Sequence, residues 1–216
     1  MIEKIYRSRF DEESVAAKRA LWSVLVRDFL QDYVPREAVV ADIGGGYCEF
    51  INAVRCRQKY VVDLNPDVKE YAGPDVEVLF SDARELRGVP DGDLDVVFAS
   101  NFFEHLPSKQ QLFEVLTEAH RVLARGGRLL VIQPNIKYAH REYWDFIDHH
   151  IALTEHSLGE ALTTSGFEIE RCIPRFLPFS VGSSPSRSPR LLEAYLKTPL
   201  LWKAFGKQTF MAGVKR

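Results

Sequence analysis

The chain has 216 residues, a length that favours one domain with insertions over several domains. Hydrophobic residues make up 46% and charged residues 27%, which is enough apolar material for a full core and excludes the polar bias of disordered chains. The 28 basic and 30 acidic residues leave a formal net charge of −2, which excludes a global field that would attract nucleic acid. We expect a single domain, 1–216, with no nucleic acid partner.

The cysteines and the N-terminus indicate a cytoplasmic protein. The three cysteines, at positions 48, 56 and 172, show no C-x-x-C spacing and suggest neither a disulfide framework nor a zinc ribbon. The first residues, MIEKIYRSRFDEES, lack the apolar region of a secretory signal, and no apolar run approaches the roughly 18 residues of a membrane span. We therefore expect a chain in a reducing compartment without a transmembrane segment.

The first two thirds of the chain alternate between predicted strands and helices. Residues 6–10 form an arm before a long helix, 13–33, that Pro35 closes. Between 109 and 123, apolar residues recur at helical spacing, and Gly126-Gly127 follow as a stop. Short apolar runs bounded by turn residues predict buried strands at 39–43, 60–62, 76–80, 94–99 and 128–132. This order predicts a doubly wound α/β sheet with helices on both faces.

The last third of the chain is expected to add two strands and a loop. Thr154 is placed to cap a helix, 156–164, which a strand at 167–173 follows. Residues 174–190 hold four Pro, five Ser and one Gly, which predicts a loop. A short helix at 191–197 ends before Pro199, and residues 208–214 form the final strand.

A glycine-rich turn gives the clearest functional signal. The strand 39–43 runs directly into Gly44-Gly45-Gly46, where backbone can turn tightly and lie against a ligand. At the end of the next predicted strand, Asp63 can accept hydrogen bonds from both hydroxyls of a ribose. A dinucleotide fingerprint would place a glycine at position 49, but Glu49 opposes a pyrophosphate there. A ligand with a ribose and no phosphate, such as S-adenosylmethionine, fits better than NAD or FAD.

Five motifs follow one another along about residues 39–133. They are Asp42-Ile43-Gly44-Gly45-Gly46, Asp63, Ser81-Asp82-Ala83, Asn101 with Glu104-His105-Leu106, and the segment RVLARGG at 121–127. In combination they resemble the motifs of the class I S-adenosylmethionine-dependent methyltransferases. The resemblance implies a Rossmann-like, seven-stranded sheet, mostly parallel with an antiparallel last strand. It divides the chain into an arm and helix, 1–36, a cofactor-binding core, 37–133, and a segment for the acceptor, the lid loop and the last two strands, 134–216.

Further motifs resemble a bacterial methyltransferase subfamily that is linked with surface-glycan biosynthesis, within the type 11 and type 23 group. These motifs are Asp148-His149, Leu153-Thr154-Glu155, Gly166-Phe167, Pro174-Arg175-Phe176-Leu177-Pro178 and Gly206-Lys207-Gln208. This second resemblance implies a glycan or another small polar molecule as the methyl acceptor.

The family resemblance implies a role for each motif residue toward S-adenosylmethionine. Asp42 and the three glycines would surround the methionine part, Asp63 would hold the ribose, and Leu64 would lie beside the adenine. The remaining contacts would come from Asp82 to the adenine amino group, from the Ala83 backbone N–H, and from Asn101 near the methyl donor. Asp82 is also placed to cap a helix beginning at Ala83. Cys48 departs from the family pattern, which has glycine there, and is strained if its φ is positive.

Three histidines are candidates for a general base because an imidazole titrates near neutral pH. His105 follows a predicted strand end, and His149 and His150 lie in the insertion after the fifth strand. The alternatives are a structural role for His105 and a polar cluster of the other two with Asp145 and Asp148. That cluster matches no metal-ligand spacing, so we expect no metal.

Segments near both ends offer further contacts. Arg7, in the arm, is a candidate partner for the cofactor carboxylate, and the alternative is a frayed terminus. The loop 174–190 is a natural lid over the acceptor. Residues 197–216 hold five basic and no acidic residues among apolar ones, which suits either an anionic membrane surface or a solvated face.

The sequence thus predicts an enzyme that transfers a methyl group from S-adenosylmethionine, with S-adenosylhomocysteine as the product. We expect O-methylation of a sugar, a glycan or another small polar acceptor. The alternatives are N- or C-methylation of a small molecule and binding of the cofactor without catalysis. A nicotinamide oxidoreductase is disfavoured by Glu49.

Overall fold

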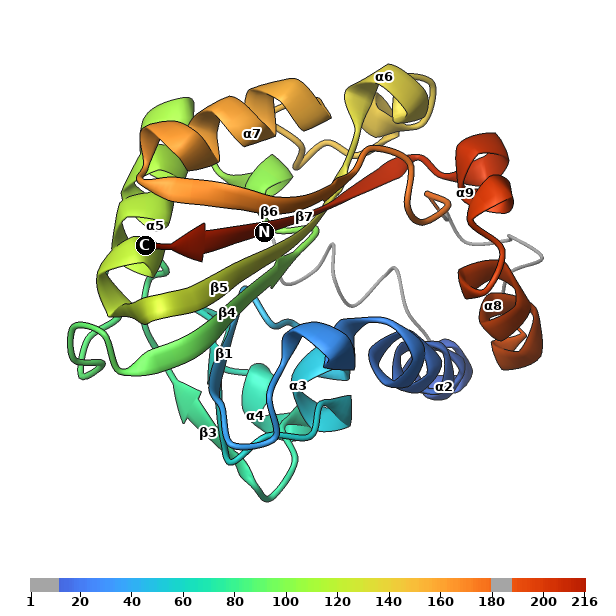
Figure 1. Cartoon of the computed structure of the whole chain (residues 1–216). Coiled ribbons are helices and arrows are strands. Elements are labelled where there is room, and N and C mark those ends of the chain that lie inside the picture. Colours follow the sequence, from blue (N-terminus) through green and yellow to red (C-terminus); the bar gives the residue numbers. More distant parts are fainter. Residues whose placement is uncertain (1–11, 180–187) are drawn as a thin grey trace.

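The computed structural model describes residues 12–179 and 188–216, within which seven strands form one sheet (Figure 1). The strand order is β3-β2-β1-β4-β5-β7-β6. All neighbours pair in parallel except β7, which lies antiparallel to both β5 and β6. The strands are β1 (Val39–Ile43), β2 (Gln58–Val62), β3 (Val76–Leu79), β4 (Leu94–Ser100), β5 (Leu123–Pro134), β6 (Phe167–Ile173) and β7 (Gln208–Lys215). The predicted fold class is confirmed.

Helices cover both faces of this sheet (Figure 1). Within the described ranges they are α2 (Glu12–Asp28), α3 (Glu49–Ala53), α4 (Val68–Tyr71), α5 (Lys109–Val122), α6 (Ile136–Ala139), α7 (Glu155–Thr164), α8 (Pro189–Leu196) and α9 (Pro199–Phe205). Short 3-10 turns are η1 (Leu30–Tyr33), η2 (Phe103–His105) and η3 (Tyr143–Asp145). Among the helices of 12–179 and 188–216, none has both the length and the apolar character to cross a bilayer.

The core is split by the sheet into two clusters. Successive strand residues point to opposite faces, so Val39 and Ala41 of β1 pack with α5 and α7, whereas Val40 packs with α2 and α3. The same division holds in β5, where Leu129 and Leu130 belong to different clusters. Because both faces are covered, β1 is buried at every position and β4 at all but Asp95 and Ser100, which explains their largely apolar runs.

Two predicted helix ends are wrong. The helix expected over 13–33 ends at Asp28 and continues as the 3-10 turn η1. The glycines expected to stop α5 lie inside β5 instead, because α5 passes directly into the strand at Leu123. The pairing of β4 with β5 shifts between Leu94 and Val96, and Gly126 takes φ +81° within this irregular segment. The glycines therefore serve a strand irregularity and not a helix end.

The C-terminal third follows the predicted order with one addition. Thr154 caps α7, accepting a hydrogen bond from the Ser157 N–H while the Ser157 hydroxyl accepts one from Thr154. The helix predicted at 191–197 is α8. The sequence does not predict α9, because Pro199 is expected only to end the preceding helix. Pro199 lies in the first turn of α9, where a missing N–H costs nothing. Much of the predicted lid loop, 180–187, lies outside the described residues.

Candidate cofactor and acceptor site

The carboxyl ends of β1, β2, β3 and β4 meet at one edge of the sheet, because these strands are parallel neighbours. The chain order reverses between β1 and β4, which is where open α/β sheets bind ligands. The structure brings the predicted cofactor residues of the described chain to this edge. Each set lies at or just after the end of one strand. Asp42 and Gly44–Gly46 belong to the end of β1, Asp63 and Leu64 to β2, Asp82 and Ala83 to β3, and Asn101 to β4.

Each glycine of the turn after β1 has its own physical reason. Gly44 has φ +66°, and a Cβ there would lie 2.4 Å from the ring of Phe102. A Cβ on Gly45 would lie 2.3 Å from a methyl group of Val61. Gly46 has φ +51°, but a Cβ there would meet nothing nearer than the Gly44 carbonyl at 4.0 Å. The first two glycines are therefore required by packing, and the third borders open space.

Cys48 takes the left-handed conformation, with φ +59°, just before α3. Its backbone N–H donates to the Gly45 carbonyl at 2.8 Å, which closes the turn. The side chain is fully buried, and burial raises the pKa of the thiol to about 12. Since φ is positive, Cys48 carries the backbone strain that is expected from the sequence for this case. Burial holds its thiol in the unreactive, protonated form.

The Asp63 carboxylate is fixed by two backbone donors. Its Oδ2 accepts from the Gly46 N–H at 3.0 Å, and its Oδ1 accepts from the Asn65 N–H at 2.8 Å. Each carboxylate oxygen has a second lone pair, so both can accept another hydrogen bond. Leu64 follows with 70% of its side chain exposed. The end of β2 therefore presents oriented acceptors beside an exposed apolar side chain.

Asp42 and Glu49 form an acidic pair beneath the turn. Burial raises the pKa of Asp42 well above its usual value, and the charges of Glu49 and Asp63 raise it further. Burial also raises the pKa of Glu49, while Lys18 of α2 opposes that change. Lys18 is itself half-buried, and its amino group lies 5.9 Å from the ring centre of Tyr47. No motif marks Lys18 in the sequence, because only the packing of α2 brings it to the turn.

Asp82 lies in a turn and not at the start of a helix, so the predicted cap for a helix at Ala83 is wrong. Its carboxylate accepts from the Arg84 backbone N–H at 2.9 Å and from the Arg84 guanidinium at 2.7 Å. These bonds to Arg84 hold the pKa of Asp82 below its usual range. Asp82 is therefore an ionised and oriented acceptor at the end of β3, next to the buried Ala83.

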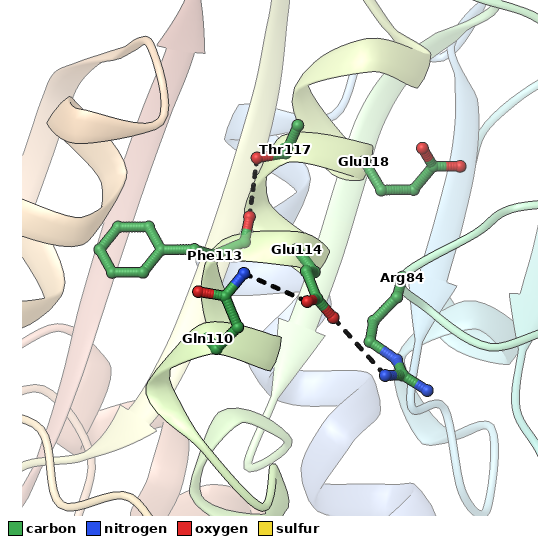
Figure 2. A pocket seen from close by; sticks show the side chains of 6 residues that line it. All are labelled: Arg84, Gln110, Phe113, Glu114, Thr117 and Glu118. Carbon is green, nitrogen blue, oxygen red and sulfur yellow. Dashed lines mark hydrogen bonds and ion pairs between the residues drawn. The ribbon is translucent and has the colours of Figure 1, made fainter.

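Arg84 also borders a shallow depression on the outer side of α5, shown in Figure 2. Its guanidinium lies 3.5 Å from the Glu114 carboxylate. The depression is lined by Arg84, Gln110, Phe113, Glu114, Thr117 and Glu118. None of the predicted site residues lines it, so we do not identify it with the cofactor crevice.

Asn101 and Glu104 lie just beyond the end of β4. Asn101 has φ +48°, and its backbone N–H donates to Ile132 of β5 at 2.9 Å. The chain then turns into η2, where the Glu104 carbonyl accepts from His150 N–H at 2.7 Å and from Ile151 N–H at 3.2 Å. These bonds attach the insertion after β5 to the end of β4.

Two of the three candidate histidines converge at this attachment. The rings of His105 and His149 lie 5.0 Å apart, and His105 Nδ1 lies 3.0 Å from the Asp148 carbonyl oxygen. His150 is exposed. The structure adds Glu104, which is 1% exposed, and burial raises the pKa of this carboxyl to about 8. The sequence places Glu104 in a motif, but it gives no sign that His149 lies beside it.

The described residues fit S-adenosylmethionine on three observations. Open space borders Gly46, the Asp63 carboxylate is oriented with lone pairs remaining, and Leu64 is exposed at the end of the adjacent strand. These features suit a methionine tail, a ribose and an adenine in that order. Arg7, the predicted partner of the cofactor carboxylate, lies outside the described residues.

Residues 41–131 match the family model described as methyltransferase domain. The match covers less than half of the chain, so the similarity to this family concerns this segment. It begins within β1 and ends within β5, and so contains the glycine turn, Asp63, Asp82 and Asn101.

One known protein is similar to this chain over part of its length. A protein of Encephalitozoon cuniculi described as a candidate methyltransferase is 29% identical over 133 residues, which is 60% of this chain and 61% of that protein. The chain thus spans about three fifths of the length of this relative.

Solved structures share the fold of this chain. The crystal structure of an S-adenosylmethionine-dependent methyltransferase from Archaeoglobus fulgidus has a TM-score of 0.68 and 23% identity, covering 91% of this chain and 94% of that one. A candidate methyltransferase from Bacillus halodurans has a TM-score of 0.65 and 19% identity, covering 88% and 98%. At these identities the similarity concerns the fold.

Proposed function

We propose that this protein transfers the methyl group of S-adenosylmethionine to a hydroxyl group of a small polar molecule, with a sugar or glycan as the favoured acceptor. The observation that carries the cofactor part is the Asp63 carboxylate, which the Gly46 N–H orients at the end of β2. It lies within the segment that matches the methyltransferase family model. The acceptor class rests on the resemblance of the segment after residue 133 to enzymes linked with glycan biosynthesis.

S-adenosylmethionine supplies a methyl group already activated on a sulfonium, so the chain has to bind, orient and exclude water. Asp63 binds the ribose hydroxyls through the lone pairs that Gly46 and Asn65 leave available. The glycine turn admits the methionine tail, because no side chain projects from Gly46. Leu64 and the ionised Asp82 lie on the adenine side, one as an apolar contact and one as an acceptor.

A hydroxyl acceptor must also lose a proton during transfer. The groups that can assist are Glu104, His105 and His149, because they converge beside the end of β4. The Asp148 carbonyl holds His105 with Nδ1 as the donor, which leaves Nε2 with the lone pair. His150 is exposed and does not belong to this group, so it is the least favoured of the three histidine candidates.

The test is an assay of S-adenosylhomocysteine formation with a panel of sugars, a panel of simple amines and no acceptor. We expect turnover with one or more sugars and none with amines. Turnover with amines alone would replace the proposal by N-methylation. Binding of S-adenosylhomocysteine without turnover on any acceptor would favour a non-catalytic role, although it would leave the cofactor assignment intact.

A further inference from the structure

We propose that Glu104, His105 and His149 form a binding site for one divalent transition-metal ion. One ligand atom of each of these residues lies within 4.8 Å of the other two. Two imidazoles and one carboxylate are a ligand set that zinc and other first-row metals use, with a position left open for a water or a substrate oxygen. The sequence does not suggest this set, because along the chain His149 clusters with Asp145, Asp148 and His150 and lies far from Glu104 and His105.

His105 is oriented as metal-ligating histidines are. Its Nδ1 lies 3.0 Å from the Asp148 backbone carbonyl and 3.4 Å from the Asp148 carboxylate. A ring nitrogen that faces two oxygens carries the proton, so Nε2 has the lone pair that a metal requires. Such an outer hydrogen bond to a carbonyl or carboxylate fixes the tautomer in known metal sites.

His149 is held rigidly by the aromatic residues of the insertion. Its ring stacks on Phe146 with centroids 4.9 Å apart, and it lies 4.6 Å from the ring centre of Tyr143. The insertion is attached to η2 because the Glu104 carbonyl accepts from the N–H groups of His150 and Ile151. The backbone that carries His149 is therefore bonded to the residue that supplies the carboxylate.

Glu104 provides the second, independent observation. It is 1% exposed, and among the described residues its Oε2 has no hydrogen-bond partner. The Gln133 amide lies close enough to lower the pKa of the Glu104 carboxyl, but in the described ranges neither of its side-chain polar atoms makes a hydrogen bond of ordinary geometry. A buried carboxylate oxygen without a partner is costly. A metal ion bonded to Oε2 would satisfy this oxygen and compensate its charge.

The geometry predicts a small contraction on binding. Zinc bonds to nitrogen and oxygen are about 2.0–2.2 Å long, so the three ligand atoms must lie closer together than 4.8 Å when bound. His105 is half-buried and its side chain can move inward from η2. Since η2 begins two residues after Asn101, a metal here would lie on the proposed acceptor side, where it could lower the pKa of a bound hydroxyl.

The test measures metal binding by the whole chain, after treatment with a chelator and its removal. Titration calorimetry with ZnCl₂ should give one ion per chain. Glu104→Gln and His105→Gln should each weaken binding at least about tenfold, since each removes one of three ligands. His140→Gln, which changes an exposed histidine of the same insertion, is the matched control and should bind as the wild type does.

A second measurement keeps the result independent of folding in the variants. With Co²⁺ in place of zinc, the wild type should develop visible absorption, which excess Zn²⁺ should abolish. Saturable binding of the metal by the wild type, together with weaker binding by both Glu104→Gln and His105→Gln, supports the site. Failure of the wild type to bind either metal would overturn it, as would unchanged affinity in both folded ligand variants or loss in His140→Gln alone. None of these outcomes depends on methyl transfer, so this inference can fail while the proposed function holds.

Discussion

Cys48 occupies a backbone conformation that disfavours any side chain. Its φ is +59°, and only glycine adopts this region without a steric cost of about 1–2 kcal/mol. Replacement by glycine also has two costs. It removes a buried sulfur from the core cluster that contains Phe50 and Val68, and glycine has more conformational entropy in the unfolded chain. Cys48→Gly and Cys48→Ala both lose the sulfur, so the difference between their stabilities reports the backbone strain without the loss of packing.

We therefore expect Cys48→Gly to be more stable than Cys48→Ala by about 1 kcal/mol. Urea denaturation followed by circular dichroism would measure the difference in the free energy of unfolding. Equal stability of the two variants, or greater stability of the alanine variant, would show that the left-handed conformation is not retained in the folded protein.

The buried Asp42 carboxyl should make the free energy of unfolding decrease as the pH rises. Burial raises its pKa in the folded protein above that in the unfolded chain, so the folded state binds the proton more tightly. The contribution to stability is present at low pH and is lost as the pH rises through the folded pKa. Glu49 and Asp63, which face it, act in the same direction.

Asp42→Asn should consequently gain stability relative to the wild type as the pH rises from about 5 to about 8. The measurement is the difference in the free energy of unfolding between the two proteins at both pH values. A difference that is constant or that shrinks as the pH rises would contradict the buried, high-pKa carboxylate. We expect this variant to bind S-adenosylhomocysteine more weakly, because Asp42 borders the glycine turn.

At the scale of elements, Glu118 joins α5 to the segment between β3 and β4. Its carboxylate accepts from the Leu86 backbone N–H at 2.6 Å and from Arg121 at 2.7 and 2.8 Å. Arg121 in turn donates to the Val89 carbonyl at 3.1 Å. These bonds hold the pKa of Glu118 below its usual value. Its stabilising effect is thus present at neutral pH and is lost only as the pH falls through that lowered pKa.

Glu118→Ala should cost about 2–3 kcal/mol in the free energy of unfolding at neutral pH, because it leaves a buried N–H and a guanidinium without their acceptor. Glu114→Ala, one turn earlier on α5 and also drawn in Figure 2, is the matched control. Glu114 pairs with Arg84 at 3.5 Å on the surface, and its loss should cost less than about 1 kcal/mol. Equal losses in both variants would contradict the proposed link.

Some of the helices and strands can be predicted from the sequence alone, and others cannot. The strands are predictable because runs such as 39–43 and 94–99 are apolar on both faces, as a covered parallel sheet requires. The end of α5 is not, because two glycines that resemble a helix stop fill a strand irregularity. The helix α9 is missed since Pro199 is compatible both with a break and with a first helical turn.

At the scale of the molecule, the predicted cofactor residues and the predicted acceptor residues are brought together in different ways. The predicted cofactor residues follow successive parallel strands, so topology alone brings them to one edge. The group of Glu104, His105 and His149 depends instead on how the insertion folds back, through the hydrogen bonds that the Glu104 carbonyl accepts. No local sequence pattern encodes such a contact between distant segments. For this reason the sequence groups His149 with Asp145, Asp148 and His150, whereas the structure places it beside Glu104 and His105.

The most direct test of the cofactor crevice is calorimetric titration with S-adenosylhomocysteine. We expect the wild type to bind it and to show no binding of NADH. Asp63→Ala should weaken binding by about 10- to 100-fold, since it removes charged acceptors of the ribose hydroxyls. Asp93→Ala, an exposed residue before β4 at the opposite edge of the sheet, should leave the affinity unchanged. If the wild type does not bind S-adenosylhomocysteine, or if folded Asp63→Ala binds it equally well, the account of this crevice is wrong.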